Sequence, residues 1–202
     1  MSRKGFDVLT STGGLIGVVV LLVAGGLLTW GHSFVNTQVH NQLAQQQIHF
    51  PPKSAFQHPN GTEFTAAMAP YMEQYGGQQM LTGAQAEAYA NHFIAIHLSE
   101  MPYQGVYSKV SAANLAAKPG SAQATKLSAL ETTVFQGTTL RGLLLEAYAF
   151  SKIGEVMLWG AIASFGLAAL MLALVALGFQ HARSTAPEKR TATAKTTTAA
   201  IA

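Results

Sequence analysis

Two long runs without a charged residue bracket this sequence, and they constrain its fold more than any other feature. They cover residues 13 to 30 and residues 156 to 179. At about 1.5 Å of rise per residue, each run forms a helix long enough to cross a hydrocarbon core roughly 30 Å thick. One such run alone is typical of a buried helix in a soluble protein. Two runs that flank a polar middle predict two membrane spans, at residues 13–31 and 153–179.

The first run also has the short basic start of a secretory signal peptide, at Arg3 and Lys4. A signal peptide usually has an apolar region of about 7 to 15 residues, followed by a small-x-small cleavage site. This run instead continues through Leu27, Leu28 and Trp30 and ends without an Ala-x-Ala sequence. It therefore predicts an uncleaved anchor.

Positive charge is concentrated near the ends of the chain. Because basic residues near membrane ends favour the cytoplasmic side, we expect residues 1–12 and 180–202 to be cytoplasmic and residues 32–152 to face outward. That middle segment contains six basic and six acidic residues. Trp30 and Trp159 lie near the outer ends of the spans, where indole rings favour the interface. The terminal charges are Arg3, Lys4, Arg183, Lys189, Arg190 and Lys195 against Asp7 and Glu188.

Composition excludes several partners and chemistries. The isoelectric point is near 9.2, but the basic excess is confined to the terminal segments. We therefore expect membrane lipids with anionic head groups, and no nucleic acid, as the charged partner. The chain has no cysteine, which removes disulfides, thiolate metal sites, iron–sulfur clusters and c-type haem. The tail 180–202 is rich in Ala and Thr, so we expect it to be disordered and to form no inward signalling domain.

The first helix is expected to continue out of the membrane. Val35 and Val39 begin an apolar series at helical spacing directly after the first span. Proline disfavours helix at the preceding residue and fixes an extended path. We therefore expect this helix to stop at Pro51 and Pro52 and residues 50–62 to form a loop.

A capping signal predicts the start of another helix. Thr82 and Gln85 have the spacing of a capping box, in which each side chain satisfies the other residue's free amide. The expected helix covers residues 83–98, and a shorter one follows at about 106–117. Ala86, Tyr89, Phe93 and Ile96 fall on one face of the longer helix.

The last helix is expected to run into the second span. Ser121 can cap a helix that reaches about Phe135, Gly137 is expected to interrupt it, and Thr138 begins its continuation. We find no period-two strand pattern and no internal repeat. The predicted fold class is all-α, with two transmembrane helices bracketing an all-helical extracytoplasmic domain whose first and last helices are continuous with the spans.

Three stretches carry a resemblance to known proteins, and they lie between the two spans. They read "QLAQQQIHFPP", "YGGQQMLTGAQAEAYANHFIAIHL" and "LRGLLLEAYAF". With the flanking spans, they resemble a group of two-span membrane proteins of high-GC Gram-positive (actinobacterial) bacteria, over most of residues 13 to 170. The resemblance implies a bacterial plasma membrane and the same topology. It implies no activity and no functional residues.

Histidine and methionine raise the question of a metal. His92 and His97 are five residues apart, which places them about 140° apart on a regular helix, unlike the i, i+4 pair of a zinc helix. We expect both to be surface or core residues. Thioether and imidazole together suit copper, although core packing is the commoner role of methionine. The candidate copper ligands are His49, His58, Met68 and Met72.

Two sets of residues are candidates for contact with partners. Small residues in the spans let a neighbouring helix approach closely, and that helix is either the other span of this chain or part of another subunit. These residues are Gly13, Gly17, Gly25, Gly26, Gly160 and Ser164. Aromatic residues of the 50–62 region and just beyond it could anchor this segment on the domain or on a neighbour. These residues are Phe50, Phe56 and Phe64.

No reaction motif is present in the sequence. It lacks Gly-x-Ser-x-Gly, His-Glu-x-x-His and a glycine-rich phosphate loop. We therefore expect no catalytic residues, no cofactor and no enzyme activity. The leading hypothesis is an accessory or assembly subunit that docks on other integral membrane proteins. The alternative hypothesis is an extracytoplasmic module that binds or senses a small ligand or copper.

Overall fold

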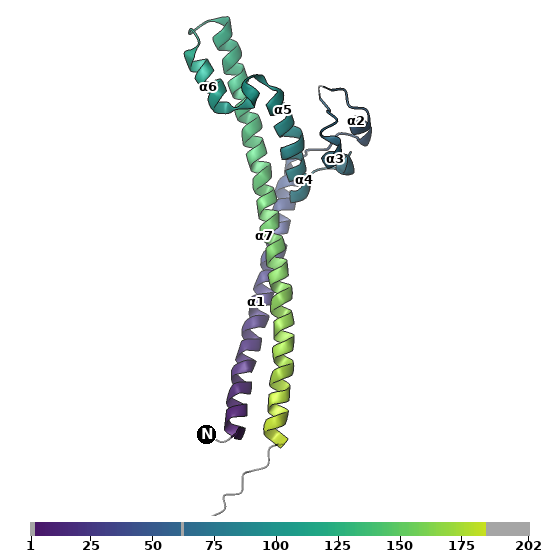
Figure 1. Cartoon of the computed structure of the whole chain (residues 1–202), viewed down its shortest axis with the longest axis vertical. Helices are drawn as coiled ribbons and strands as arrows, with labels where there is room; N and C mark the ends of the chain where they lie inside the picture. Colours follow the sequence, from purple (N-terminus) through teal and green to yellow (C-terminus); the bar gives the residue numbers. More distant parts are fainter. Residues whose placement is uncertain (1–2, 62, 185–202) are drawn as a thin grey trace, which may run out of the picture. The chain divides into compact units, whose positions relative to one another are not determined.

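The computed structural model describes residues 3–61 and 63–184, and this part of the chain is helical with no β-strand. Two long helices, α1 (Arg3–Gln46) and α7 (Ala122–Ser184), enclose a series of short helices in the sequence (Figure 1). Both long helices are long and apolar enough to cross a membrane. The all-helical prediction is confirmed, as is the continuity of the first and last helices with the apolar runs.

The chain divides into two compact units. The terminal unit contains the first part of α1, up to Gly25, and the last part of α7, from Ile162. The middle unit is Gly26–Ala161. It contains the remainder of both long helices and all the short ones.

In the terminal unit, α1 and α7 pack antiparallel through a seven-residue repeat. A repeat of seven keeps one stripe of each helix against its partner. Glycine permits close approach: a Cβ at Gly17 would lie 2.7 Å from the sulfur of Met171. The buried residues of the repeat are Ser11, Val18 and Gly25 on α1 and Ala168, Val175 and Ala182 on α7.

The middle unit has its own hydrophobic core. Helix α4 (Gly83–Tyr89) begins with the predicted capping box: Thr82 Oγ1 accepts the Gln85 amide at 3.3 Å, and Gln85 Oε1 accepts the Thr82 amide at 3.1 Å. The helix continues through a π-helical turn, η2 (Ala90–Ile94), into α5 (Ala95–Glu100). Four parts of the chain contribute buried core residues: Val39 and Leu43 of α1, Phe50, Phe56, Met68, Met72 and Met80 of the segment between α1 and α4, Ala86, Ala90, Ile94 and Leu98 of the α4–α5 segment, and Leu144 of α7.

The end of α1 differs from the prediction. The helix ends at Gln46, before the two prolines, because Gln47 adopts a left-handed conformation with φ of 53°. The chain can then pair with a distant segment: the Phe50 amide donates to the Gln78 carbonyl at 2.8 Å, and the Met80 amide to the Ile48 carbonyl at 2.8 Å.

The predicted loop at residues 50–62 is also partly wrong. Residues 53 to 57 form a short helix, α2 (Lys53–Gln57), that follows directly on the second proline. Proline is well suited to the start of a helix, where the missing amide proton has no partner to lose. Two further short elements follow, α3 (Ala69–Met72) and the 3-10 helix η1 (Glu73–Tyr75).

Helix α6 (Tyr107–Ala116) follows the 3-10 helix η3 (Pro102–Gly105), as expected for a helix at about 106–117. A polar contact holds it to α7: the Asn114 side-chain amide donates to Glu131 Oε2 at 2.7 Å. Hydrogen bonds from Ser111, Asn114 and Tyr107 hold the pKa of Glu131 below its usual value. The Glu131 carboxylate therefore favours docking of α6 when it is ionised.

Helix α7 starts as predicted and then departs from the prediction. Ser121 caps it, since its hydroxyl accepts the Ala124 amide at 3.1 Å. Gly137 does not interrupt it. A Cβ there would lie 2.9 Å from a methyl carbon of Leu98, so this glycine allows α5 to approach closely and does not break the helix. The helix extends to Ser184, which makes residues 180–184 of the predicted tail helical; the other tail residues, with Lys189, Arg190 and Lys195, lie outside the described residues.

Candidate partner-binding groove

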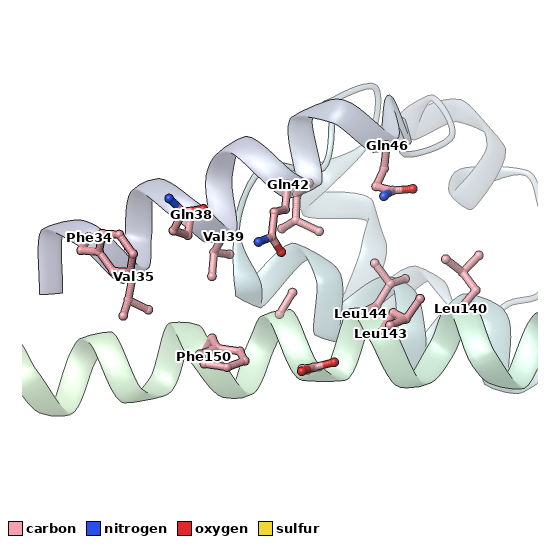
Figure 2. Close-up of a pocket in the computed structure, with 13 residues that line it drawn as sticks. Phe34, Val35, Gln38, Val39, Gln42, Gln46, Leu140, Leu143, Leu144 and Phe150 are labelled. Atoms are coloured by element: carbon pink, nitrogen blue, oxygen red, sulfur yellow. The ribbon is translucent and has the colours of Figure 1, made fainter. Parts of the chain in front are cut away.

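A groove of about 440 Å³ lies between α1 and α7 in the middle unit (Figure 2). We call it the stalk groove. Its volume lies within the range of about 300–1,000 Å³ that is usual for clefts that bind ligands. Its lining residues are Phe34, Val35, Gln38, Val39, Gln42, Leu43 and Gln46 of α1 and Leu140, Leu143, Leu144, Glu146, Ala147 and Phe150 of α7.

The walls of the stalk groove follow from the periodicity of α1. Val39 and Leu43 are buried in the core, and they form the floor of the groove on the α1 side. Residues four apart form a ridge along a helix. Gln38, Gln42 and Gln46 form such a ridge beside the buried stripe, and Gln42 and Gln46 extend from α1 toward α7 (Figure 2).

Large apolar side chains of the groove are open to solvent. Phe34 is 51% exposed, Leu143 58% and Phe150 47%. The ring of Phe34 also stacks on Trp30, with ring centroids 5.6 Å apart. Isolated exposed apolar residues are normal on a protein surface, but several that line one concavity indicate a binding surface.

The polar side chains of the groove are exposed. The side-chain amides of the three glutamines and the carboxylate of Glu146 make no hydrogen bond or ion pair with any residue that the structure describes. Glu146 is also the only charged residue in the lining. The groove thus offers amide groups and one negative charge beside an apolar surface.

Two linked side-chain hydrogen bonds connect α7, which forms one wall of the stalk groove, to the α4–α5 segment. Arg141 Nη2 donates to Asn91 Oδ1 at 2.9 Å, and Asn91 Nδ2 donates to Glu87 Oε1 at 2.8 Å. The Nε atom of Arg141 is buried and has no partner among the described residues. This arrangement orients one face of α7 toward the core and leaves the neighbouring face, with Leu140 and Leu143, toward the groove.

The lining favours binding over reaction, because it contains hydrocarbon, amides and a single carboxylate. Among the residues described, no group of three or more His, Asp or Glu side chains could hold a metal ion. The chain has no match among protein-family models, curated proteins or solved structures. Its function is therefore inferred from the geometry of its own residues.

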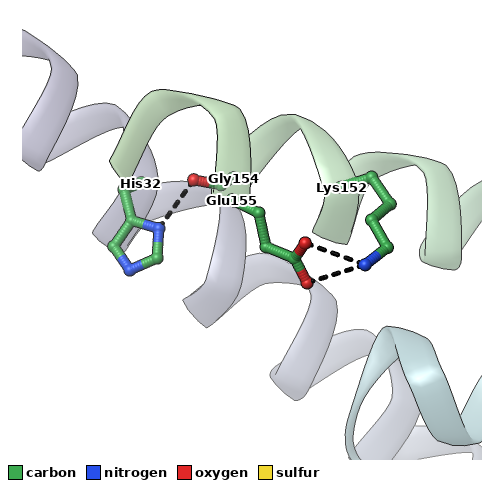
Figure 3. A network of polar contacts seen from close by, with 4 residues as sticks. All are labelled: His32, Lys152, Gly154 and Glu155. Atoms are coloured by element: carbon green, nitrogen blue, oxygen red, sulfur yellow. Dashed lines mark hydrogen bonds and ion pairs between the residues drawn. The ribbon is translucent and has the colours of Figure 1, made fainter. Parts of the chain in front are cut away.

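A second, more polar pocket of about 530 Å³ lies in the middle unit, next to a cluster of polar contacts (Figure 3). In that cluster, the His32 ring Nδ1 lies 2.8 Å from the Gly154 carbonyl oxygen. Lys152 Nζ pairs with Glu155 at 2.8 Å, which is the i, i+3 ion pair of one helix turn. The pocket itself is lined by Asn36, Thr37, Val39, His40, Leu81, Thr82, Gly83, Ser151 and Glu155.

The small residues proposed for partner contact have divided roles. Gly17, Gly25 and Gly160 face the other long helix of the same chain; a Cβ at Gly25 would lie 2.8 Å from the Phe165 ring, and one at Gly160 3.2 Å from Leu28. Ser164 is half-buried. A Cβ at Gly13 or Gly26 would meet no described atom within 4 Å, so these two of the five proposed glycines leave space for a neighbour. Close-approach glycines that the prediction missed are Gly14, Gly31, Gly154 and Gly178.

The aromatic partner candidates are core residues. Phe50 and Phe56 are buried, and Phe64 is half-buried with its ring 5.9 Å from that of Phe56. The Phe50 ring packs against Tyr75 and Tyr89. These rings therefore anchor the segment on the domain, which is the first of the two predicted alternatives, and the buried Phe50 and Phe56 are not available to a partner.

The four candidate copper ligands lie in two different environments. Met68 and Met72 are fully buried in the hydrophobic core, whereas His49 and His58 are exposed. His49 Nδ1 lies 3.0 Å from the Gln47 carbonyl. The buried thioethers have the packing role that is usual for methionine.

The spacing argument for His92 and His97 assumed a regular α-helix, but His92 lies within the π-helical turn η2 and His97 lies in α5, which follows it. In such a turn hydrogen bonds join residues five apart, so the estimate of 140° does not apply. The His92 ring stacks on Tyr71 with centroids 3.5 Å apart, and His97 Nδ1 lies 2.8 Å from the Phe93 carbonyl. Both rings thus have packing partners.

Sequence reasoning did not find the stalk groove. The signal available was the series Gln38, Gln42 and Gln46, with Phe34 four residues before it. Glutamine is usual on a solvated helix face, so this spacing alone does not distinguish a groove wall from ordinary surface.

Proposed function

We propose that this chain is a non-catalytic accessory or assembly subunit of a larger membrane complex, and that it docks on other integral membrane subunits. The observation that carries the proposal is the stalk groove, whose exposed Phe34, Leu143 and Phe150 line one concavity. Apolar anchors in a concave site with unpaired polar groups at its edge are typical of protein interfaces.

The proposed location is an actinobacterial plasma membrane, with both termini in the cytoplasm and residues 32–152 outside. The apolar character of α1 and α7 supports two spans. The basic residues near the chain ends support the orientation, since they favour the cytoplasmic side. In this arrangement the stalk groove lies directly outside the membrane, where it can reach the outer part of a neighbouring membrane subunit.

The spans contribute a smaller part of the proposed interface. Gly17 and Gly25 are already filled by side chains of α7. Gly13 and Gly26 have open space and can accept a helix of another subunit. Lipid contacts the rest of the exposed apolar surface.

The test is extraction of the tagged full-length chain from its native membranes with a mild detergent, followed by quantitative mass spectrometry. The expected result is one or more integral membrane proteins in fixed molar ratio to the chain. A chain that is recovered only as a monomer or homodimer, from membranes in which the extraction preserves known complexes, overturns the proposal.

An alternative function is the binding or sensing of a small ligand outside the membrane, and the second pocket favours it. Its lining offers the hydroxyls of Thr37 and Ser151, the amide of Asn36 and the carboxylate of Glu155. Small polar ligands are bound by such convergent groups. This alternative predicts an isolated chain whose melting temperature rises with a polar small molecule and whose rise is lost in Ser151→Ala; copper gains no support, because Met68 and Met72 are buried.

A further inference from the structure

We propose that the stalk groove binds one amphipathic helix of a partner subunit, apolar on the face that enters the groove and carrying a Lys or Arg opposite Glu146. This inference rests on the proposed function as a subunit and names the site and the chemistry of the partner. A second copy of the chain and a lipid are the competing occupants.

The dimensions of the groove suit a helix. Its α1 wall runs from Phe34 to Gln46, which are twelve residues apart and therefore about 18 Å along the helix axis. This length corresponds to about three turns of a partner helix. The α1 wall is a ridge of residues four apart, the geometry in which helices interlock ridge into groove.

The apolar lining gives the contact its anchors. Phe34 and Phe150 lie at one end of the groove and Leu140 and Leu143 toward the other, so apolar side chains are available along its whole length. An amphipathic helix presents apolar residues at i, i+3, i+4 and i+7, and this apolar face could contact the apolar lining along the length of the groove. Burial of exposed aromatic and leucine side chains is the usual source of affinity in such a contact.

The polar groups select a helix over a lipid chain. An acyl chain in the groove would place three glutamine amides and the Glu146 carboxylate against hydrocarbon without partners, which is unfavourable. An anionic head group would also be repelled by Glu146, the only charged residue of the lining. A partner helix can satisfy the amides with polar side chains and Glu146 with a basic one, and it gains charge complementarity.

Site-specific photo-cross-linking of the full-length chain in its native membranes tests the occupant. The photoreactive amino acid p-benzoylphenylalanine replaces Gln42 in one variant, Leu143 in a second and Leu115, an exposed residue of α6 outside the groove, in the control. The expected adducts at the two groove positions map to one segment of one membrane protein, with apolar residues at helical spacing and a Lys or Arg, and the control gives none of them. Adducts to lipid, to a second copy of this chain or to no segment in common overturn the proposal.

Charge reversal provides the second test. Glu146→Lys is expected to reduce the groove adduct at least tenfold, whereas Glu100→Lys, the same change at an exposed site outside the groove, leaves it unchanged. Replacement of the partner's basic residue by Glu is expected to restore the adduct with Glu146→Lys. An unchanged adduct in Glu146→Lys, or no restoration in the double variant, overturns the charge pairing.

The two proposals fail in different ways. If partners co-purify in fixed ratio but no groove adduct forms, the groove proposal is wrong and the subunit proposal stands. If no partner co-purifies and no adduct forms, both are wrong.

Discussion

Replacement of Phe50 by alanine distinguishes a core residue from a partner contact. Phe50 is 3% exposed and follows the end of α1. Its ring lies 5.2 Å from that of Tyr75 and 5.6 Å from that of Tyr89, measured between centroids. Removal of the ring leaves a cavity next to η1 and α4, and it should destabilise the middle unit, because Phe50 does not line the stalk groove but belongs to the core.

The expected loss is large relative to the stability of a small domain. Phe→Ala substitutions in cores cost about 3–5 kcal/mol, and native domains are stable by about 5–15 kcal/mol. A loss of about 3 kcal/mol corresponds to an opening equilibrium that is on the order of 100-fold more populated. Phe50→Leu keeps most of the volume and should cost less than about 1.5 kcal/mol.

Hydrogen–deuterium exchange of the full-length chain in mild detergent measures this change. Peptides that cover Gly83–Tyr89 should exchange on the order of 100-fold faster in Phe50→Ala, because α4 packs on the lost ring. The control Leu115→Ala, at a side chain that is 86% exposed, should leave exchange unchanged. If Phe50→Ala abolishes partner co-purification while exchange stays at the wild-type rate, Phe50 is a partner contact and the packing argument is refuted.

Three further perturbations follow from the packing. Gly17→Leu should lower the melting temperature in detergent, because its Cβ would lie 2.7 Å from the Met171 sulfur, whereas Gly13→Leu, in open space, should leave it unchanged; equal effects would contradict the close approach. Arg141→Met should destabilise the middle unit by about 1–3 kcal/mol, since it removes the partner of a half-buried amide, and urea unfolding measures the change. The pKa of Glu131 is lowered in the folded state, so its stabilisation of α6 should be complete above the ordinary value of 4.5 and fade as the pH falls below it; exchange of α6 amides should show this, and Glu131→Gln should remove the pH dependence.

Local signals in the sequence predicted local structure well. The Thr82 and Gln85 capping box and the Ser121 cap both form as expected, because each depends on residues three or four apart. The two long apolar helices were equally clear, since composition and length alone determine them. The periodicity that begins at Val35 and Val39 also identified one buried face of α1 correctly.

Features that depend on distant neighbours were not predictable in this way. Gly137 breaks a helix only if nothing compensates its cost of about 1 kcal/mol, and here contact with Leu98 gives it a packing role. The end of α1 at Gln46 depends on pairing with residues near Gln78, about thirty positions away. The burial of Phe50 depends on the same pairing, since its amide donates to the Gln78 carbonyl. The sequence placed the helix end at the prolines and could not show this pairing, and for that reason Phe50 was retained as a candidate partner contact.

The division of α1 into two faces explains why the stalk groove is the strongest candidate interface. In the middle unit, Val39 and Leu43 are buried in the core, while Phe34 and the glutamine ridge beside them remain exposed. A helix face that contacts only water usually carries polar residues, whereas here the exposed Phe34 lies in the same groove as the exposed Phe150 and Leu143 of α7. Three of the five glycines proposed for partner contact in the spans already accommodate side chains of the same chain. The stalk groove therefore offers more exposed apolar surface to a partner than these glycines do. A subunit of this design would therefore recognise its partner mainly through the middle unit and use the spans as an anchor.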